Sequence, residues 1–361
     1  MFLKANDLSI DVKSVLMVCD TILQKIILQT IAVFLLVLFS MQVTGAAELK
    51  SNLQQNTDHF TVYLSPFGDD DNNGLSLASP IMSLQKAHDI LLDYQPQRPV
   101  DIVINAGTYY FQEVKWRYTN GHKITFKAFN QKIERPVFDG SLVSDTWFTF
   151  DSRDGEASYL NFRHLKVQNY NVGMTFRGDR ENIERWNGYN ELYSMYFYRI
   201  GGMFYSARHS TAAVRFINSR NNKIRNSHFV DILNRSDTAH LIHPVYLAHY
   251  SSDNEIIKNR FLRSNGNPIA IRDASNFNMI QNNRFIQAGN RSILQDWYCV
   301  QGRHSCTKQV TECPSVGNRL AGNEIYRGYF GEIRFFELFF DSNYCGRNSE
   351  ARLRTAINLR K

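Results

Sequence analysis

The chain has 361 residues, of which 43% are hydrophobic and 13% aromatic, and it carries a formal net charge of +7. This apolar content is enough to bury a large core, which excludes a chain without a fold of its own. The 25 Phe and 18 Tyr residues favour strands over helices. The basic charge suits an anionic glycan, a nucleic acid or an anionic membrane surface, although it could equally serve solubility alone.

The N-terminal segment has the pattern of an export signal. Ile26–Met41 is a run of sixteen uncharged residues after Lys25, and small residues follow at Thr44–Ala47. The run is short for a membrane span, which needs about twenty residues. We therefore expect residues 1–47 to be a signal peptide, with an uncleaved anchor as the alternative, and the protein to be secreted or periplasmic. Its removal takes away three basic and three acidic residues, so the charge stays at +7.

Beyond this segment the chain contains four cysteines, Cys299, Cys306, Cys313 and Cys345. An even number in an exported chain predicts two disulfides, and three connectivities remain open. A zinc site is the competing interpretation, but the spacings contain no Cys-x-x-Cys and no suitably placed pair of histidines.

An internal repeat of the form N-x-I-x-x-N-x-F sets the expected fold. It is clearest at Asn254–Phe261 and Asn278–Phe285, with weaker copies at 222–229 and 318–325 and more distant ones at 190–197 and 160–167. The last positions of the copies are separated by 30, 32, 32, 24 and 40 residues.

These spacings predict a parallel β-helix. One coil of three short strands and three turns takes roughly two dozen residues, so a step of 24 is a bare coil and longer steps carry insertions. The repeated apolar residues would stack inside the coils, and the repeated Asn would form side-chain ladders at the turns. A leucine-rich repeat would need more Leu and a constant period, and a propeller blade would need about forty residues.

The residues before the repeats fit the same architecture. Strands are expected at 61–64, 101–111, 124–129 and 136–140. Between the first two, Ser83 can cap a short helix that places four apolar side chains on one face; these are Leu84, Ala87, Ile90 and Leu91. We expect this helix to cover the open end of the coil, where strand edges need protection.

The motifs VYLSPFGDDDNNG, SLQKAHDIL, DIVINAGTYYF, ITFKAFN and RPVFDGS, followed by the Asn repeats, resemble the pectate-lyase-like superfamily. The resemblance covers nearly all of 60–345. It implies an all-β, single-stranded, right-handed parallel β-helix over 48–361 with a short N-terminal capping helix. That superfamily includes polysaccharide lyases, C5-epimerases, glycoside hydrolases and proteins without catalytic activity, so the fold does not select the reaction.

In this fold, catalysis usually occurs on the outward face of one stacked sheet. Aligning the strands that precede the Asn motifs, VYLAHYS at 245–251 and IAIRDAS at 269–275, places Tyr246 and Arg272 on that face of adjacent coils. Arg215 falls one coil further away if the earlier coil is offset by one residue. Removing the C5 proton of a uronate requires that the carboxylate charge be offset, and a guanidinium can pair with it through two hydrogen bonds.

Histidines cluster around the same strand. His243 precedes Pro244 and is expected to lean over the edge of the face, where a neutral imidazole could accept a proton. His249 should lie level with Asp273 of the next coil and could bond it, either as part of the site or as a structural pair. His240 and His243 form H-x-x-H without a third ligand, so we expect no metal site there.

The same segment is similar to the periplasmic mannuronan C5-epimerases. In those enzymes the resemblance implies a His base in an Asp-Pro-His-Asp motif and an Arg on a strand of the form I-x-x-R-x-x-x-N. Here Ile269–Arg272 approximates the second element, whereas Ile242–Val245 lacks the flanking carboxylates of the first.

The sequence therefore predicts a lyase acting on an acidic, uronate-containing polysaccharide by β-elimination. His243 would be the base, Tyr246 the acid or auxiliary base, and Arg272 the group that neutralises the carboxylate. The expected substrate-binding residues are Arg215, Tyr250, His249, Asp273 and Trp297.

A C5-epimerase shares these roles, and two further alternatives remain open. One is a glycoside hydrolase built on paired carboxylates such as Asp273 and Asp296, and the other is a non-catalytic glycan-binding scaffold. No cofactor is firmly expected, although Ca²⁺ could offset the carboxylate charge. We expect a monomer that binds no nucleic acid and contacts a membrane only through an uncleaved signal.

Overall fold

The structure is a computed structural model that describes residues 58–132, 134–205, 208–300, 312–338, 345 and 353–356. The signal segment 1–47, Cys306 and Cys19 lie outside these residues. From His59 onward the described chain forms one compact unit. Within the described part, no helix is both long and apolar enough to span a membrane.

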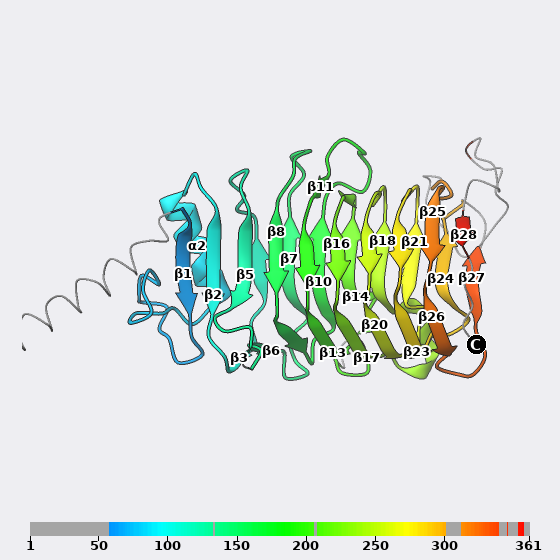
Figure 1. Cartoon of the computed structure of the whole chain (residues 1–361), viewed down its shortest axis with the longest axis horizontal. Coiled ribbons are helices and arrows are strands. Elements are labelled where there is room, and N and C mark those ends of the chain that lie inside the picture. Colours follow the sequence, from blue (N-terminus) through cyan, green and yellow to red (C-terminus); the bar gives the residue numbers. More distant parts are fainter. Residues whose placement is uncertain are drawn as a thin grey trace, which may run out of the picture. The chain divides into compact units, whose positions relative to one another are not determined.

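Three sheets of parallel strands run along this unit, and the chain passes through them in turn (Figure 1). Sheet 1 consists of β1 (Phe60–Leu64), β2 (Val100–Ile104), β5 (Ile124–Ala128), β8 (Leu160–Arg163), β12 (Glu191–Tyr193), β16 (Lys223–Arg225), β19 (Glu255–Ile257), β22 (Met279–Gln281), β25 (Asn318–Ala321) and β28 (Leu353–Ala356).

Sheet 2 consists of β3 (Thr108–Tyr110), β6 (Val137–Asp139), β9 (Lys166–Gln168), β13 (Tyr196–Ile200), β17 (His228–Ile232), β20 (Arg260–Ser264), β23 (Arg284–Ala288) and β26 (Glu324–Arg327). Sheet 3 consists of β4 (Val114–Trp116), β7 (Thr146–Asp151), β10 (Val172–Arg177), β14 (Ala212–Ile217), β18 (His243–Ala248), β21 (Ile269–Arg272), β24 (Ser292–Trp297) and β27 (Arg334–Leu338). Each coil therefore contributes one strand to each sheet, which is the parallel β-helix predicted from the repeat.

The repeat positions are register partners from coil to coil. Phe197, Phe229, Phe261 and Phe285 stack inside the core with ring centroids 4.9, 5.0 and 4.8 Å apart. Phe261 and Phe285 lie 24 residues apart and are directly paired, so the bare coil is confirmed. Because identical positions stack at the inter-strand spacing, the core is a column of aligned apolar side chains.

The predicted Asn ladders are confirmed at two of the turns. Before sheet 1, each Asn donates from its backbone and side chain to the Oδ1 of the next coil's Asn, at 2.8–3.0 Å; the members are Asn190, Asn222, Asn254, Asn278 and Asn318. A second ladder between sheets 1 and 2 joins Asn259, Asn283 and Asn323. These bonds satisfy buried amides that the turns would otherwise leave without partners.

The predicted helix is α2 (Leu84–Tyr94), which lies at the β1 end of the coils (Figure 1). The Ser83 hydroxyl accepts a hydrogen bond from the Lys86 amide at 3.1 Å, as expected of an N-cap. Leu84, Ala87, Ile90 and Leu91 are all buried in the main core. The apolar face of α2 therefore packs against the first coil.

One of the expected disulfides joins Cys313 to Cys345. Cys299 is disulfide-bonded as well. The Cys313–Cys345 bond ties the segment that follows β24 to a segment near the C-terminal end of the chain.

Candidate functional site

The outward face of sheet 3 carries two columns of side chains in strict register. One column contains Lys115, Thr149, Thr175, Arg215, Tyr246, Ala270 and Gln295. The other contains Asp151, Arg177, Ile217, Ala248, Arg272 and Trp297. The predicted arrangement is confirmed, because Tyr246 pairs with Arg215 on one side while Arg272 lies on the following strand.

Arg215 is a guanidinium held by neutral groups. Its Nε and Nη2 donate to the Thr175 hydroxyl at 3.2 and 3.0 Å, and its Nη1 donates to the Thr211 hydroxyl at 3.0 Å. Among the described residues, no carboxylate lies within ion-pair distance of it. Burial lowers the pKa of Arg215 to about 10, and the nearby Arg177 contributes in the same direction. Arg215 therefore keeps its charge at neutral pH and has the electrostatic character of an anion-binding group.

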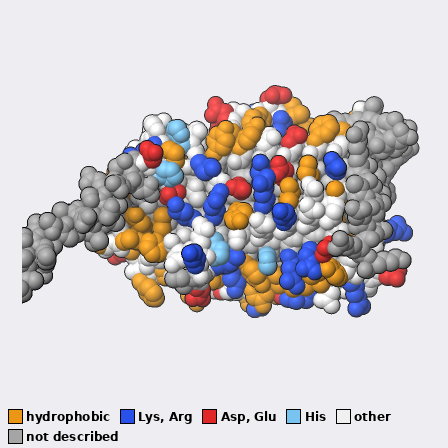
Figure 2. All heavy atoms as spheres, viewed as in Figure 1, with side chains coloured by type: hydrophobic (Ala, Val, Ile, Leu, Met, Phe, Trp, Pro, Cys, Tyr) orange, Lys and Arg blue, Asp and Glu red, His pale blue; other side chains and the backbone are white. Residues whose placement is uncertain are grey.

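The outward face of sheet 1 carries several basic side chains that, unlike Arg215, are paired with acids of neighbouring coils. Lys127 contacts Asp101 at 2.6 Å, Arg163 contacts Glu191 at 3.0 Å, and Lys223 contacts Glu255 at 3.6 Å. Lys and Arg side chains likewise lie among acidic ones on the face shown in Figure 2. The net positive charge alone therefore does not locate the site.

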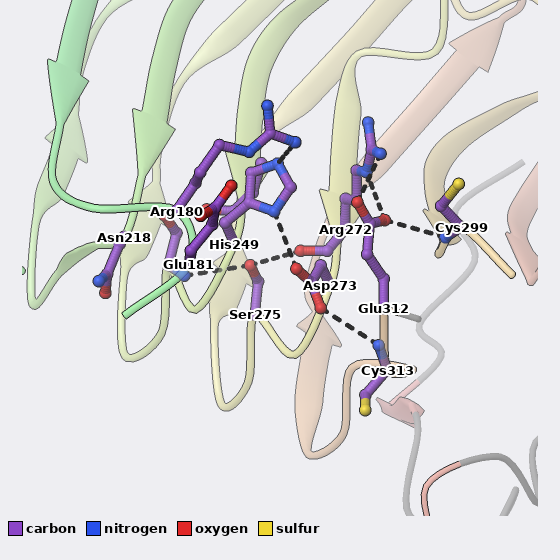
Figure 3. Close-up of polar contacts among 12 residues, drawn as sticks. Arg180, Glu181, Asn218, His249, Arg272, Asp273, Ser275, Cys299, Glu312 and Cys313 are labelled. Atoms are coloured by element: carbon purple, nitrogen blue, oxygen red, sulfur yellow. Dashed lines mark hydrogen bonds and ion pairs between the residues drawn. The ribbon is translucent and has the colours of Figure 1, made fainter. Parts of the chain in front are cut away.

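Arg272 is already paired within the protein. Its Nε and Nη2 donate to the two carboxylate oxygens of Glu312, both at 2.6 Å (Figure 3). Its guanidinium carbon lies 4.1 Å from the centre of the Trp297 ring. Its Nη1 points to the Tyr246 hydroxyl at 3.4 Å. Although burial opposes it, hydrogen bonding to Glu312 raises the pKa of Arg272. Burial also raises the pKa of Tyr246, so its phenol stays protonated at neutral pH.

Glu312 was not anticipated from the sequence. It lies 40 residues beyond Arg272 at the end of the insertion after β24, and its Oε2 also accepts from the Cys299 amide at 2.9 Å. The neighbouring Cys313 was the only signal that this segment is held against the coils.

His243 is the first residue of β18 and is buried, with 4% of its surface exposed. The expectation that it leans over the edge of the face is therefore wrong. Its Nδ1 lies 2.7 Å from the Asn267 carbonyl, so Nδ1 carries the proton and Nε2 is a free acceptor in the neutral ring. Burial lowers the pKa of His243 to about 4. The ring centroid lies 5.6 Å from that of Tyr246.

His249 and Asp273 form the predicted cross-coil pair, with Nδ1 and Oδ2 2.8 Å apart. The other ring nitrogen, Nε2, lies 3.1 Å from Nη2 of Arg180, which comes from the loop after β10 (Figure 3). Since the guanidinium can only donate, Nε2 accepts and Nδ1–H donates to Asp273. Arg180 was also missed, because it reaches His249 across 69 residues of sequence.

One group of side chains has the composition of a metal site. Ligand atoms of His249, Asp273 and Glu312 all lie within 4.8 Å of one another. Their capacity is already used, however, because Asp273 also accepts from the Cys313 amide at 3.1 Å and Glu312 accepts from Arg272 through both oxygens. A cation would have to displace these donors, so the arrangement fits a hydrogen-bonded network better than an open coordination sphere.

The acids proposed for hydrolysis do not form a pair on the outward face. Asp296 pairs with the inward Ile271 and is 2% exposed, and Asp273 is engaged by His249. Trp297 does lie on the face but stacks on Arg272, and Tyr250 lines a pocket beyond the ends of the strands. Of the predicted site residues, Tyr246, Arg272 and Arg215 are thus brought together, with His243 buried beside them.

Several solved structures share this architecture. The chain is similar to an alginate lyase from Paenibacillus, with a TM-score of 0.50 and 15% identity over 84% of this chain and 100% of that one. It also matches a pectate lyase, with a TM-score of 0.47 and 12% identity over 83% and 78%, and a rhamnogalacturonan lyase, with a TM-score of 0.38 and 11% identity over 77% and 86%. No protein-family model and no curated protein matches the sequence. Together with the all-parallel sheets, the likeness to the alginate lyase shows that the chain folds as a right-handed parallel β-helix.

Proposed function

We propose that this protein is a polysaccharide lyase that acts on a uronate-containing polymer at the outward face of sheet 3. The observation that carries the proposal is Arg215, a positively charged side chain whose three described hydrogen bonds all go to threonine hydroxyls. A substrate carboxylate would supply the missing counter-charge beside Tyr246, the register partner of Arg215.

The proposed roles follow from charge and protonation. Arg215 would bind the carboxylate and so make the C5 proton easier to remove. His243, neutral and with Nε2 free of a proton, would accept that proton as the C5–H bond breaks. The electron pair would form the C4=C5 double bond and expel the C4 oxygen, and the protonated Tyr246 would donate its proton to that oxygen. Because His243 is buried, the polymer would have to reach it past Tyr246.

Arg272 takes a different role in this proposal from the one its sequence position suggested. Its two-pronged pairing is already made with Glu312, so it would position the Tyr246 hydroxyl through Nη1 rather than bind the substrate carboxylate. Since a guanidinium would supply the charge, we also propose that cleavage needs no Ca²⁺. The apolar run at 26–41 supports export as the setting for this activity.

The test is a panel of acidic polysaccharides incubated with the protein, with and without chelator. A lyase generates unsaturated uronates, seen as ultraviolet absorbance, and we expect Arg215→Ala to lower the rate at least 100-fold. Arg163→Ala, on the outward face of sheet 1, is the matched control and should leave the rate unchanged.

Two other results would reassign or overturn the proposal. No absorbance together with an altered NMR spectrum of the polymer would identify a C5-epimerase, which uses the same three groups. Binding without either change, or full activity in Arg215→Ala, would overturn the enzymatic assignment at this face.

A further inference from the structure

Where the chain enters sheet 1 from sheet 3, the last residue of the turn is left-handed in six successive coils. These residues, with φ between 52° and 68°, are Tyr159, Tyr189, Asn221, Asp253, Phe277 and Gly317. Each directly precedes the first position of the sequence repeat. Asn, Asp and Gly tolerate this backbone conformation well, whereas bulky side chains adopt it at an energetic cost. The turn geometry therefore explains three of the six residues and leaves the two Tyr and the Phe unexplained.

A second turn of the same geometry provides the comparison. Between sheets 1 and 2, the left-handed residues have φ between 52° and 61°, and they are His164, Ser194, Asn226, Lys258, Asn282 and Gly322. None of these six is Phe or Tyr. Since the backbone requirement is the same at both turns, the aromatic residues of the first turn serve something other than the turn.

The aromatic side chains of the first turn point into solvent. Tyr159, Tyr189 and Phe277 are 37%, 45% and 59% exposed, although large apolar rings are ordinarily buried. The rings of Tyr159 and Tyr189 lie 5.7 Å apart, and Trp186 lies 6.2 Å from Tyr189. Arg220 lies over the Trp186 ring, with its guanidinium carbon 5.8 Å from the ring centroid. We call Tyr159, Trp186, Tyr189 and Phe277 the aromatic edge.

A pocket of about 200 Å³ is lined by Phe277 of this edge and by Arg220, which also contacts Trp186. Phe277, Tyr250 and Ile183 give it apolar walls, while Arg220 and Asp253 bring a donor and an acceptor to it. The Phe277 ring is fixed against Gly317, where an added Cβ would come within 2.4 Å of the ring. An aromatic wall combined with planar polar groups suits a pyranose, which has apolar C–H faces and a rim of hydroxyls.

We propose that the aromatic edge and its pocket form a second glycan-binding surface, on which pyranose rings stack while Arg220 and Asp253 hydrogen-bond one sugar's hydroxyls. The proposal rests on the proposed function and deepens it, since Tyr250 and Ala274 of the pocket each lie two residues beyond the ends of β18 and β21. Polar positions at Asn221 and Asp253 interrupt the rings, whereas a protein partner or a membrane would favour a continuous apolar patch.

The experiment measures binding of the full chain to polygalacturonate, alginate and hydroxyethylcellulose by affinity gel electrophoresis. We expect Phe277→Ala and Tyr189→Ala to weaken binding to at least one of the three polymers about tenfold or more. Phe111→Ala is the matched control, because Phe111 is also 59% exposed and has a φ of 58° but lies at a different turn. It should bind as the unaltered protein does.

Two measurements separate a folding defect from a binding defect. The thermal unfolding midpoints of all variants are compared with that of the unaltered protein. Polymer binding is also measured for Gly317→Ala, which disturbs the Phe277 ring without removing it. Unchanged binding in both aromatic variants would overturn the proposal, as would a change in oligomeric state in those variants, because the edge would then be a self-association surface. Failure of the lyase proposal looks different, since it would show as full cleavage of a short oligouronate by Arg215→Ala, whatever the polymer binding of Phe277→Ala and Tyr189→Ala.

Discussion

At the scale of single residues, the site depends on a buried group and a half-buried group, and their surroundings shift the pKa of each. His243 is held neutral by burial, and Tyr246 is kept protonated by burial despite the nearby Arg272. A neutral imidazole and a protonated phenol are the forms that a base and an acid must have before elimination begins. Burial thus favours both protonation states at neutral pH.

The depressed pKa of His243 predicts a pH dependence of stability. Below its ordinary value of 6.5 the unfolded chain binds a proton that the folded chain accepts only near pH 4. The contribution of His243 to the unfolding free energy therefore keeps its full value above about pH 6.5. It decreases by about 3 kcal/mol as the pH falls to 4. Urea unfolding measures the unfolding free energy at several pH values. For His243→Gln we expect this free energy to fall less steeply between pH 6.5 and 4 than in the unaltered protein. His122→Gln, an exposed site, should keep the slope of the unaltered protein, and equal slopes in all three would contradict the assignment.

The buried pair of Arg272 and Glu312 gives a second prediction. Glu312→Gln keeps the size of the side chain but leaves a buried guanidinium without its counter-charge, so we expect a loss of about 3 kcal/mol in unfolding free energy. Glu255→Gln, which removes a more exposed partner on sheet 1, should cost less than about 1 kcal/mol. Chemical denaturation measures both, and similar losses would mean that burial of the Arg272 pair is unimportant.

At the scale of elements, the ladders determine which strands pair. An Asn at each coil accepts from the coil before and donates to the coil after, so a slip of one residue would break every bond in the ladder. The segment from Arg215 to the ladder residue Asn222 is one residue shorter than the segment from Tyr246 to Asn254. The missing residue falls between β14 and Asn222, so Arg215 and Tyr246 remain register partners. The register of the candidate site is thus set by turns on the far side of the strands.

Interrupting the ladder should be costly. Asn254→Ala removes the acceptor of two buried donors of Asn222, at 2.9 and 2.8 Å, and we expect a loss of about 3 kcal/mol. Gln281→Ala, a partly exposed change on the outward face of β22, should be near neutral. Denaturant unfolding measures both variants. If Asn254→Ala were as mild as its control, the ladder would be a consequence of the register rather than a cause of it.

At the scale of the whole molecule, the strands of each coil pair only with those of neighbouring coils, so stability is distributed along the axis. The Cys313–Cys345 bond closes a separation of 32 residues at one end. In the chain-entropy description, such a link contributes about 4 kcal/mol. Its effect should be concentrated in the coils that it joins.

Replacing both cysteines, Cys313→Ser with Cys345→Ser, is therefore expected to loosen the C-terminal coils first. Hydrogen exchange followed by mass spectrometry should show faster exchange over β25 and β26, with β5 and β8 unchanged. A uniform increase along the chain would instead indicate that the coils unfold as one cooperative unit.

The sequence by itself determined the β-helix, the interior stacking of Phe261 on Phe285, the Asn ladders, the capping helix from Ser83 and the shared face of Tyr246 and Arg272. These features follow from short-range patterns that recur in each coil. Because neighbouring coils repeat the same local geometry, periodicity in the chain translates directly into contacts in space.

Only the tertiary structure decided which charges at the site are satisfied. Glu312 reaches Arg272 across 40 residues and Arg180 reaches His249 across 69, both from insertions that carry no repeat. The path of an insertion depends on its own packing and not on coil periodicity. The repeat pattern in the sequence therefore does not predict that Glu312 and Arg180 contact the site. The tertiary contacts leave Arg215 bonded to threonine hydroxyls, bury His243 and give Arg272 a partner within the protein.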